Sequence, residues 1–140
     1  MKKFITLNKY GELYIDKILF ETYFPIIFTC KNENNDIFIC VCCQCNENGC
    51  KWLVGRTNGS FIVRMLQNEI TIRQLLLDCC TEKISVDYKN QEYAIAYNNS
   101  DWNEESDYLP KKDAYIDAEG GEFDEEIAYF TSIEHVEYND

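Results

Sequence analysis

Four stretches rich in β-branched and aromatic residues follow one another in the first half of the chain, with only short polar segments between them. We predict a strand for each stretch, namely residues 12–20, 26–30, 37–45 and 50–56. The run 31–36 has turn composition, and Asn48-Gly49 readily adopts the positive φ values of a tight hairpin. Because such short connections join neighbouring strands antiparallel, the pattern predicts a four-stranded antiparallel meander.

Two short helices are predicted after this meander. Ser60 is the expected N-cap of the first, which runs to Leu66. The second spans residues 72–79 and begins at Thr71-Ile72-Arg73-Gln74. This motif matches a capping box, in which the Thr and Gln side chains bond each other's backbone amides.

The strand pattern returns beyond the second helix. Residues 83–88 and 93–97 alternate apolar and polar side chains and predict a further hairpin. Residues 114–116 fit a short edge strand, and residues 125–133 fit either a weak helix or a final strand. The predicted fold class is α+β: an antiparallel meander sheet with two short helices packed on one face and an acidic C-terminal segment.

The net charge of the chain is concentrated at one end. Residues 101–140 hold 14 acids against Lys111 and Lys112, which accounts for the whole net charge of −12, whereas residues 1–100 are neutral. With 140 residues, 46% of them hydrophobic, the chain is long enough for one substantial core. We therefore predict a single domain over residues 1–140, with a neutral body and an acidic C-terminal segment.

The acidic segment also carries aromatic residues, which favours a surface presented to a basic partner. The carboxylates expected to bind that partner are those of Asp101, Glu104, Glu105, Asp107, Asp117, Glu119, Glu122, Asp124, Glu125 and Glu126. Carboxylates on a rigid scaffold can pair with the Arg and Lys of a basic channel made for DNA or RNA. Direct binding of nucleic acid is not expected, because phosphates would meet a net charge of −12.

These observations lead to a hypothesis about function. We expect a non-enzymatic inhibitor or adaptor that occupies the basic nucleic-acid-binding surface of a host defence complex, in the manner of an anti-CRISPR protein. The abundance of Tyr, Phe, Asn, Ile and Lys is typical of an AT-rich genome and favours a phage or another mobile element as the source. The simpler alternative is that the negative charge serves solubility alone.

Five of the eight cysteines lie within eleven residues, at positions 40, 42, 43, 45 and 50. Without an export signal, we expect free thiols in a reducing cytosol. Side chains alternate along a strand, so Cys40 and Cys42 should face away from Cys43 and Cys45, and four thiols should not converge from one strand. A zinc- or thiol-dependent regulatory site using Cys43, Cys45 and Cys50 across the turn stays open as the alternative function.

The sequence contains no recognisable catalytic signature. His135 is the only histidine that could serve a Cys nucleophile, and no phosphate loop, serine elbow or dinucleotide fingerprint occurs. Sequence neighbours such as Glu104 and Glu105 fit a solvated face better than an acid–base pair. Residues 117–124 are only distantly similar to a calcium loop, because Glu122 stands where Gly is required. We therefore predict no enzyme activity, no metal and no cofactor.

The N-terminus does not match a targeting segment. Asn8, Lys9 and Glu12 interrupt any apolar region after the positive start, and no small-residue cleavage site follows. The longest apolar stretches are strand-length, far below the roughly 20 residues that cross a bilayer. We expect no membrane association and a cytoplasmic location.

Several short motifs occur in a characteristic order over residues 7–80. They are Gly11-Glu12-Leu13, Tyr23-Phe24-Pro25-Ile26-Ile27-Phe28, Asn48-Gly49 before Trp52-Leu53, and Ile70-Thr71-Ile72-Arg73. In this order the chain resembles a family of small uncharacterised bacterial proteins, a domain of unknown function. The cysteine cluster departs from that family. Because the family has no established activity, the resemblance implies a fold and transfers no catalytic residue.

Overall fold

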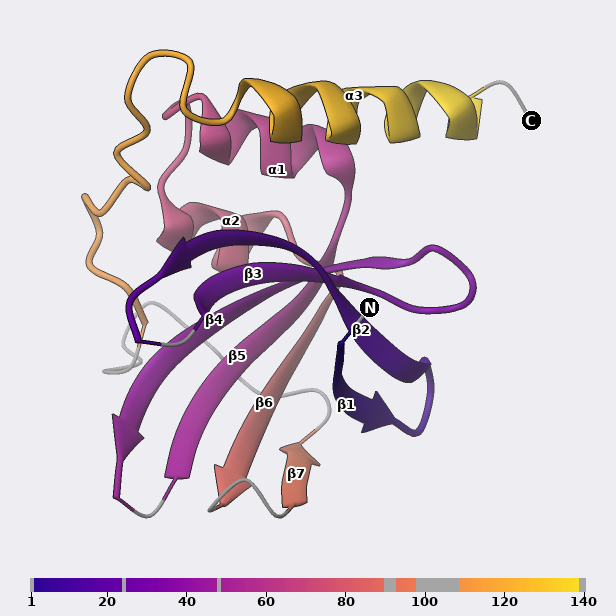
Figure 1. Cartoon of the computed structure of the whole chain (residues 1–140), viewed down its shortest axis with the longest axis vertical. Coiled ribbons are helices and arrows are strands. Elements are labelled where there is room, and N and C mark those ends of the chain that lie inside the picture. Colours follow the sequence, from indigo (N-terminus) through magenta and orange to yellow (C-terminus); the bar gives the residue numbers. More distant parts are fainter. Residues whose placement is uncertain (1, 24, 48, 90–92, 98–108, 139–140) are drawn as a thin grey trace.

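The computed structural model describes residues 2–23, 25–47, 49–89, 93–97 and 109–138, without the side chains of residues 89, 93–97 and 134–138. Within these residues, one antiparallel sheet has seven strands whose order in space follows the chain (Figure 1). The strands are β1 (Lys3–Leu7), β2 (Gly11–Glu21), β3 (Pro25–Lys31), β4 (Ile37–Asn46), β5 (Gly49–Thr57), β6 (Glu82–Lys89) and β7 (Tyr93–Tyr97). The predicted meander and the second hairpin are both confirmed.

β1 is the strand that the sequence pattern did not predict. Its pairing with β2 shifts between Lys3 and Ile5, and the neighbours Phe4 and Ile5 are both buried. A bulge of this kind interrupts the alternation of inward and outward side chains, so the strand lacks its usual sequence signature. Gly11, with φ of 77°, then turns the chain into β2.

Three helices are present in the described residues: α1 (Gly59–Leu66), α2 (Ile72–Asp78) and α3 (Asp124–Tyr138). The N-cap of α1 is Asn58 and not the predicted Ser60, because the Asn58 side chain accepts a hydrogen bond from the Phe61 amide at 3.0 Å. The capping box of α2 is confirmed: the Gln74 amide donates to Thr71 Oγ1, and the Thr71 amide donates to Gln74 Oε1. Among the described residues, no helix has the length and apolar character that crossing a membrane requires.

Residues 114–116 form no strand, contrary to the prediction. The carbonyl of Ala114 accepts a hydrogen bond from the Ile72 amide at 3.2 Å. Ile72 lies in the first turn of α2, where amides have no partner inside the helix. This segment therefore supports the start of α2 and does not extend the sheet. Residues 125–133 belong to α3, so the helical alternative for them is correct.

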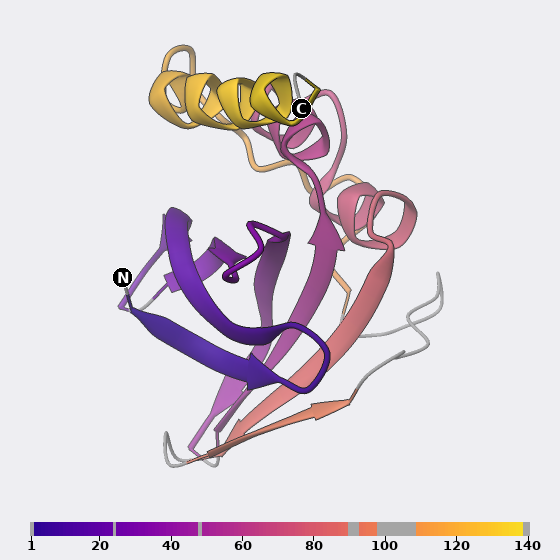
Figure 2. The ribbon, with the colours of Figure 1, turned by 90° about the vertical axis from the view of Figure 1, so that its right-hand side faces the viewer.

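The sheet is strongly curved, and each of its faces has its own core (Figure 2). The helices pack on the convex face and enclose what we call the helical core. Its buried residues are Leu19, Ile27, Ile37, Ile39, Val41, Leu53, Ile62, Met65, Leu66, Ile70, Ile72, Leu75, Leu76, Leu109, Phe123 and Phe130. The predicted α+β class with helices on one face is thus confirmed, and α3 joins the two predicted helices there.

The concave core on the opposite face draws all of its buried residues, among those described, from the strands. Its buried residues are Phe4, Ile5, Leu7, Leu13, Phe28, Cys30, Phe38, Cys40, Trp52, Val54, Ile84 and Val86. The ring of Phe4 on β1 reaches Trp52 on β5 and Tyr88 on β6, with centroid distances of 5.3 and 5.6 Å. Since β1 and β6 are far apart in strand order, the sheet must curl into an incomplete barrel for these rings to meet.

Candidate functional site

Six of the ten predicted partner-binding carboxylates lie in the described residues, and all six fall between residues 117 and 126, which we call the acidic stretch. They are Asp117, Glu119, Glu122, Asp124, Glu125 and Glu126. All are exposed except Glu126, which is half-buried, and the stretch contains no Lys or Arg. The other four, Asp101, Glu104, Glu105 and Asp107, lie outside the described residues.

The acidic stretch is fixed to the helices by backbone and side-chain contacts. Asn68, just after α1, donates to the carbonyl of Ala118 at 3.1 Å and accepts from the Ala118 amide at 3.2 Å. The Phe123 side chain is buried in the helical core. Asp117 and Gly121 adopt positive φ values of 56° and 84°, which shape the loop between these two attachment points.

α3, which carries the C-terminal half of the stretch, packs against α1 (Figure 1), and its Tyr129 side chain reaches the sheet. Phe130 is fully buried in the helical core. The Tyr129 hydroxyl donates to Asp16 on β2 at 2.6 Å, and the ammonium groups of Lys17 and Lys31 lie over the Tyr129 ring. Burial and the hydrogen bond to Asp16 raise the pKa of Tyr129, so the hydroxyl stays a donor at neutral pH.

Part of the acidic charge has a structural explanation. Asp124, Glu125 and Glu126 occupy the first turn of α3. Negative side chains there interact favourably with the positive end of the helix dipole, by about 0.3–1 kcal/mol each. Asp117 and Glu119 precede the helix, and their carboxylates have no such role. In the described residues, this loop gathers no group of three carboxylates fit to hold a cation, so the distant likeness to a calcium loop has no counterpart in the fold.

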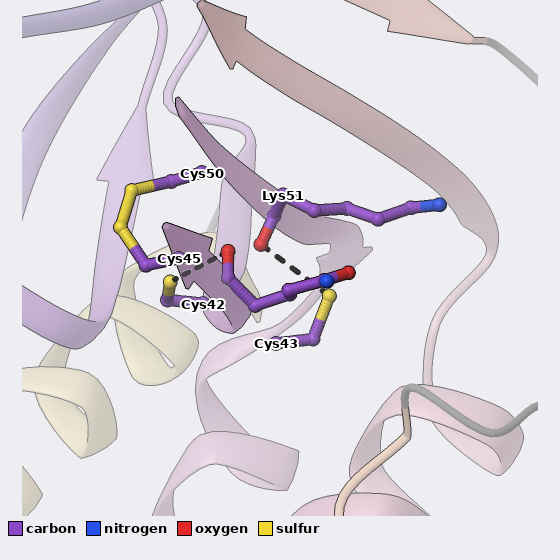
Figure 3. Close-up of a disulfide and its surroundings, with 6 residues drawn as sticks. Cys42, Cys43, Cys45, Cys50 and Lys51 are labelled. Atoms are coloured by element: carbon purple, nitrogen blue, oxygen red, sulfur yellow. Dashed lines mark hydrogen bonds between the residues drawn. A yellow bond between two sulfur atoms is a disulfide. The ribbon is translucent and has the colours of Figure 1, made fainter. Parts of the chain in front are cut away.

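The cysteine-rich end of the β4–β5 hairpin differs from the prediction in two ways (Figure 3). Cys45 and Cys50, directly opposite each other on the two strands, are joined by a disulfide, although free thiols were expected. The antiparallel register sets Cys45 directly opposite Cys50, with 4.1 Å between their Cα atoms, and so brings their side chains together. The antiparallel register, which composition does not reveal, therefore overrides the expectation of free thiols at these two positions.

The second difference concerns which thiol accompanies this pair. The β4–β5 register shifts between Cys42 and Gln44, so the bulge places Cys43 and Gln44 opposite a single residue, Lys51. Cys42 consequently shares the concave face with Cys45 and Cys50, whereas Cys43 packs against the helical core. The predicted set of Cys43, Cys45 and Cys50 is therefore wrong in one member, because strict alternation does not hold across a bulge.

Burial raises the pKa of the Cys40, Cys43 and Cys80 thiols and makes them weak acids. It raises the pKa of Cys43 to about 11 and that of Cys80 to about 12, and the Cys43 thiol donates to the Lys51 carbonyl at 3.3 Å. Cys30 and Cys40 are fully buried in the concave core, with 3.7 Å between their sulfur atoms. A nucleophilic cysteine needs a lowered pKa and access to its substrate, so Cys43 and Cys80 are poor candidates for their raised pKa, and Cys30 and Cys40 are poor candidates because they are enclosed. The side chain of His135 lies outside the description.

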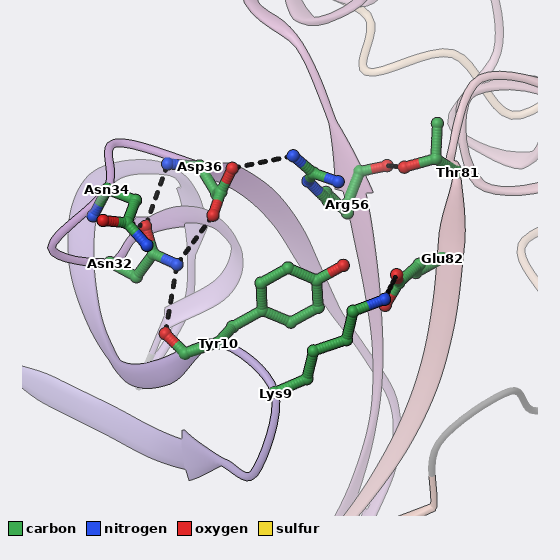
Figure 4. A network of polar contacts seen from close by, with 8 residues as sticks. All are labelled: Lys9, Tyr10, Asn32, Asn34, Asp36, Arg56, Thr81 and Glu82. Atoms are coloured by element: carbon green, nitrogen blue, oxygen red, sulfur yellow. Dashed lines mark hydrogen bonds and ion pairs between the residues drawn. The ribbon is translucent and has the colours of Figure 1, made fainter.

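A polar network that sequence reasoning missed connects the β1–β2 turn to the β3–β4 turn (Figure 4). The Asn32 amide group donates to the carbonyl of Tyr10 and to Asp36, and Arg56 pairs with Asp36 at 2.8 Å. Lys9 pairs with Glu82 at 2.6 Å. These hydrogen bonds and ion pairs hold the turns in place relative to each other. The run of turn-forming residues at 31–36 was the only sequence signal for this network.

Comparisons with known proteins supply no relative for this chain. No protein-family model, curated protein or solved structure matches it. The resemblance to uncharacterised bacterial proteins therefore stays a prediction, and the function has to be argued from the residues themselves.

Proposed function

We propose that the protein is a non-enzymatic binding protein whose acidic stretch docks onto a basic, nucleic-acid-binding surface of an effector, and so blocks it. The observation that carries this proposal is a run of six carboxylates without a compensating base, held on an ordered scaffold by Asn68, Phe123 and Phe130. A solvated tail would need no such anchoring.

The structural order of the acidic stretch affects its affinity for a basic partner. A disordered acidic peptide loses conformational entropy when it binds, whereas side chains on a fixed loop and helix lose less. The Asn68 contacts and the buried Phe123 restrain the backbone of the stretch before any partner arrives. The carboxylates can then form charge-assisted hydrogen bonds with Arg and Lys that otherwise hold phosphates.

The charge also sets the kinetics and the salt dependence. An unbalanced acidic surface raises the rate of encounter with a basic partner, and this effect weakens as salt screens the charges. The acidic stretch and nucleic acid would both pair with the basic side chains of the same channel. They should therefore compete for the effector, and their like charges would keep them from binding there together.

The test is inhibition of target-DNA binding by a guide-loaded Cas9-type effector, measured at low and high salt. One variant neutralises the stretch without changing side-chain size: Asp117→Asn, Glu119→Gln, Glu122→Gln and Glu125→Gln. A matched control removes the same charge from exposed positions elsewhere: Glu21→Gln, Glu33→Gln, Glu47→Gln and Glu69→Gln. Asn tolerates the positive φ at position 117, so the loop should keep its shape.

We expect inhibition to fall by about tenfold or more in the first variant, to change little in the control, and to weaken with salt. Equal losses in the two variants would mean that overall charge matters and the stretch does not. Absence of inhibition by the wild-type chain would reject this class of effector as the partner.

A further inference from the structure

Three sulfur atoms gather at the end of the β4–β5 hairpin. The Sγ atoms of Cys42, Cys45 and Cys50 all lie within 4.8 Å of one another. Across the part of the chain that the structure describes, this is the only cluster of three side chains able to ligate a metal. Figure 3 shows Cys42 beside the Cys45–Cys50 disulfide, while Cys43 lies apart from them.

We propose that, after reduction of the Cys45–Cys50 disulfide, Cys42, Cys45 and Cys50 bind one thiophilic divalent metal ion of the zinc class as three thiolates. This site does not depend on the acidic stretch, so it can be tested independently of the proposed function.

The geometry suits such an ion. Zn–S bonds are about 2.3 Å long, so sulfur ligands of a tetrahedral zinc ion lie just under 4 Å apart. The Cys42 Sγ atom already lies within 4.8 Å of the other two sulfur atoms, and the bulge in β4 is what turns Cys42 toward them. The Cys45 and Cys50 sulfur atoms, bonded to each other in the disulfide, reach that spacing only when reduction lets them separate. A site of this kind therefore needs side-chain adjustment and no change of fold.

The cluster is accessible from solvent. Cys45 is exposed, and Cys42 and Cys50 are half-buried. A surface hollow lined by residues that include Asn46, Gly49 and Cys50 opens beside it. A reductant and a metal ion can thus enter, and a water molecule can complete the tetrahedron.

The redox step decides whether the ion can bind. In the oxidised chain, Cys45 and Cys50 share a bond and cannot both supply thiolates. A dithiol reductant supplies two electrons and two protons, which convert the disulfide to two thiols while the dithiol becomes a disulfide. Binding of the metal ion by Cys42, Cys45 and Cys50 then releases three protons to solvent. Oxidation would reverse the sequence and expel the ion.

The other described thiols lack this arrangement. Cys43 faces the opposite side of the sheet and donates its thiol hydrogen to Lys51. Cys30 and Cys40 are enclosed in the concave core without a third ligand. Cys43 therefore offers a matched control, since it is adjacent in sequence and excluded by geometry.

The experiment is a titration of the full-length chain with Co²⁺ and then Zn²⁺, in the oxidised form and after reduction. We expect one Co²⁺ per reduced chain with the absorption of tetrahedral thiolate coordination, its displacement by Zn²⁺, and no binding to the oxidised chain. Cys42→Ser should lower the affinity by about tenfold or more, whereas Cys43→Ser should leave it unchanged.

A second readout uses wild-type protein alone, so it does not depend on whether the variants fold. Bound Zn²⁺ should protect Cys42, Cys45 and Cys50 from alkylation, as read by fragment mass spectrometry, and should leave the reactivity of Cys43 unchanged. Metal binding that survives Cys42→Ser, an equal loss in Cys43→Ser, protection of Cys43 alone, or less than about a tenth of an equivalent of zinc in reduced, folded protein would each overturn the proposal.

Discussion

The two faces of the sheet are stabilised in different ways. The concave core is built by residues 4–86 through the curl of the strands, and aromatic contacts such as Phe4 with Phe28 and Trp52 close it. The helical core is completed by residues from the acidic C-terminal segment, namely Leu109, Phe123 and Phe130. Among the described residues, a segment that looks like a charged appendage therefore contributes to the core on one face of the sheet and not to the core on the other.

Removal of residues 101–140 should have the largest effect. This deletion opens the helical core at Leu109, Phe123 and Phe130, and each such loss costs about 2–5 kcal/mol. The total is comparable with the whole stability of a small domain. We expect the truncated chain to lose cooperative thermal unfolding, measured by circular dichroism. A sharp transition near the melting temperature of the full chain would show that the concave core suffices for cooperative folding.

Phe130→Ala and Phe28→Ala sharpen the contrast between the faces. Both rings are buried, and each truncation should cost about 3–5 kcal/mol. Phe130→Ala should accelerate hydrogen exchange mainly in α3, whose docking it weakens, whereas Phe28→Ala should accelerate exchange throughout β3–β5. Tyr23→Ala, at a fully exposed ring, is the control and should be nearly neutral. Identical exchange patterns in the two core variants would mean that the faces unfold as one unit.

Gly55→Ala tests the close approach of the segment after α2 to the sheet. A Cβ at position 55 would collide with the Cys80 sulfur and lie 3.1 Å from the Cys80 Cβ. Overpacking of this kind should lower the free energy of unfolding, measured by urea denaturation, by about 1–3 kcal/mol. Cys80→Ala should relieve most of the cost when combined with Gly55→Ala, because it removes the colliding atom. Additive effects of the two substitutions would place the strain elsewhere.

Tyr129→Phe should have the smallest effect. It removes the hydroxyl that donates to Asp16 while keeping the ring under Lys17 and Lys31. We expect a loss of about 1 kcal/mol in the free energy of unfolding, measured by urea denaturation. Asp16→Asn in the Tyr129→Phe background should add no more than about 1 kcal/mol, since it then removes only the ion pair of Asp16 with Lys31 at 3.9 Å. A large additional loss would assign Asp16 a different main partner.

Local patterns in the sequence predicted most of the architecture. The Asn48-Gly49 turn and the alternating stretches identified six of the seven strands, and the Thr71–Gln74 capping box identified the start of α2. Three of the failures share one cause: β1, the segment 114–116 and the Cys43 bulge all depend on contacts with residues distant in sequence or across a strand pair. The periodicity of apolar residues along the chain carries no information about such contacts.

The candidate sites divide in the same way. The sequence by itself determined the concentration of carboxylates beyond residue 100, the abundance of cysteines, the four-stranded meander of β2–β5 and the β6–β7 hairpin, because charge, composition and short turns are local properties. Only the tertiary structure decided that the acidic stretch is anchored through Asn68 and Phe123, and that Cys42 joins Cys45 and Cys50. Both outcomes follow from packing and strand register. These bring together side chains whose spacing along the chain does not indicate that they are in contact.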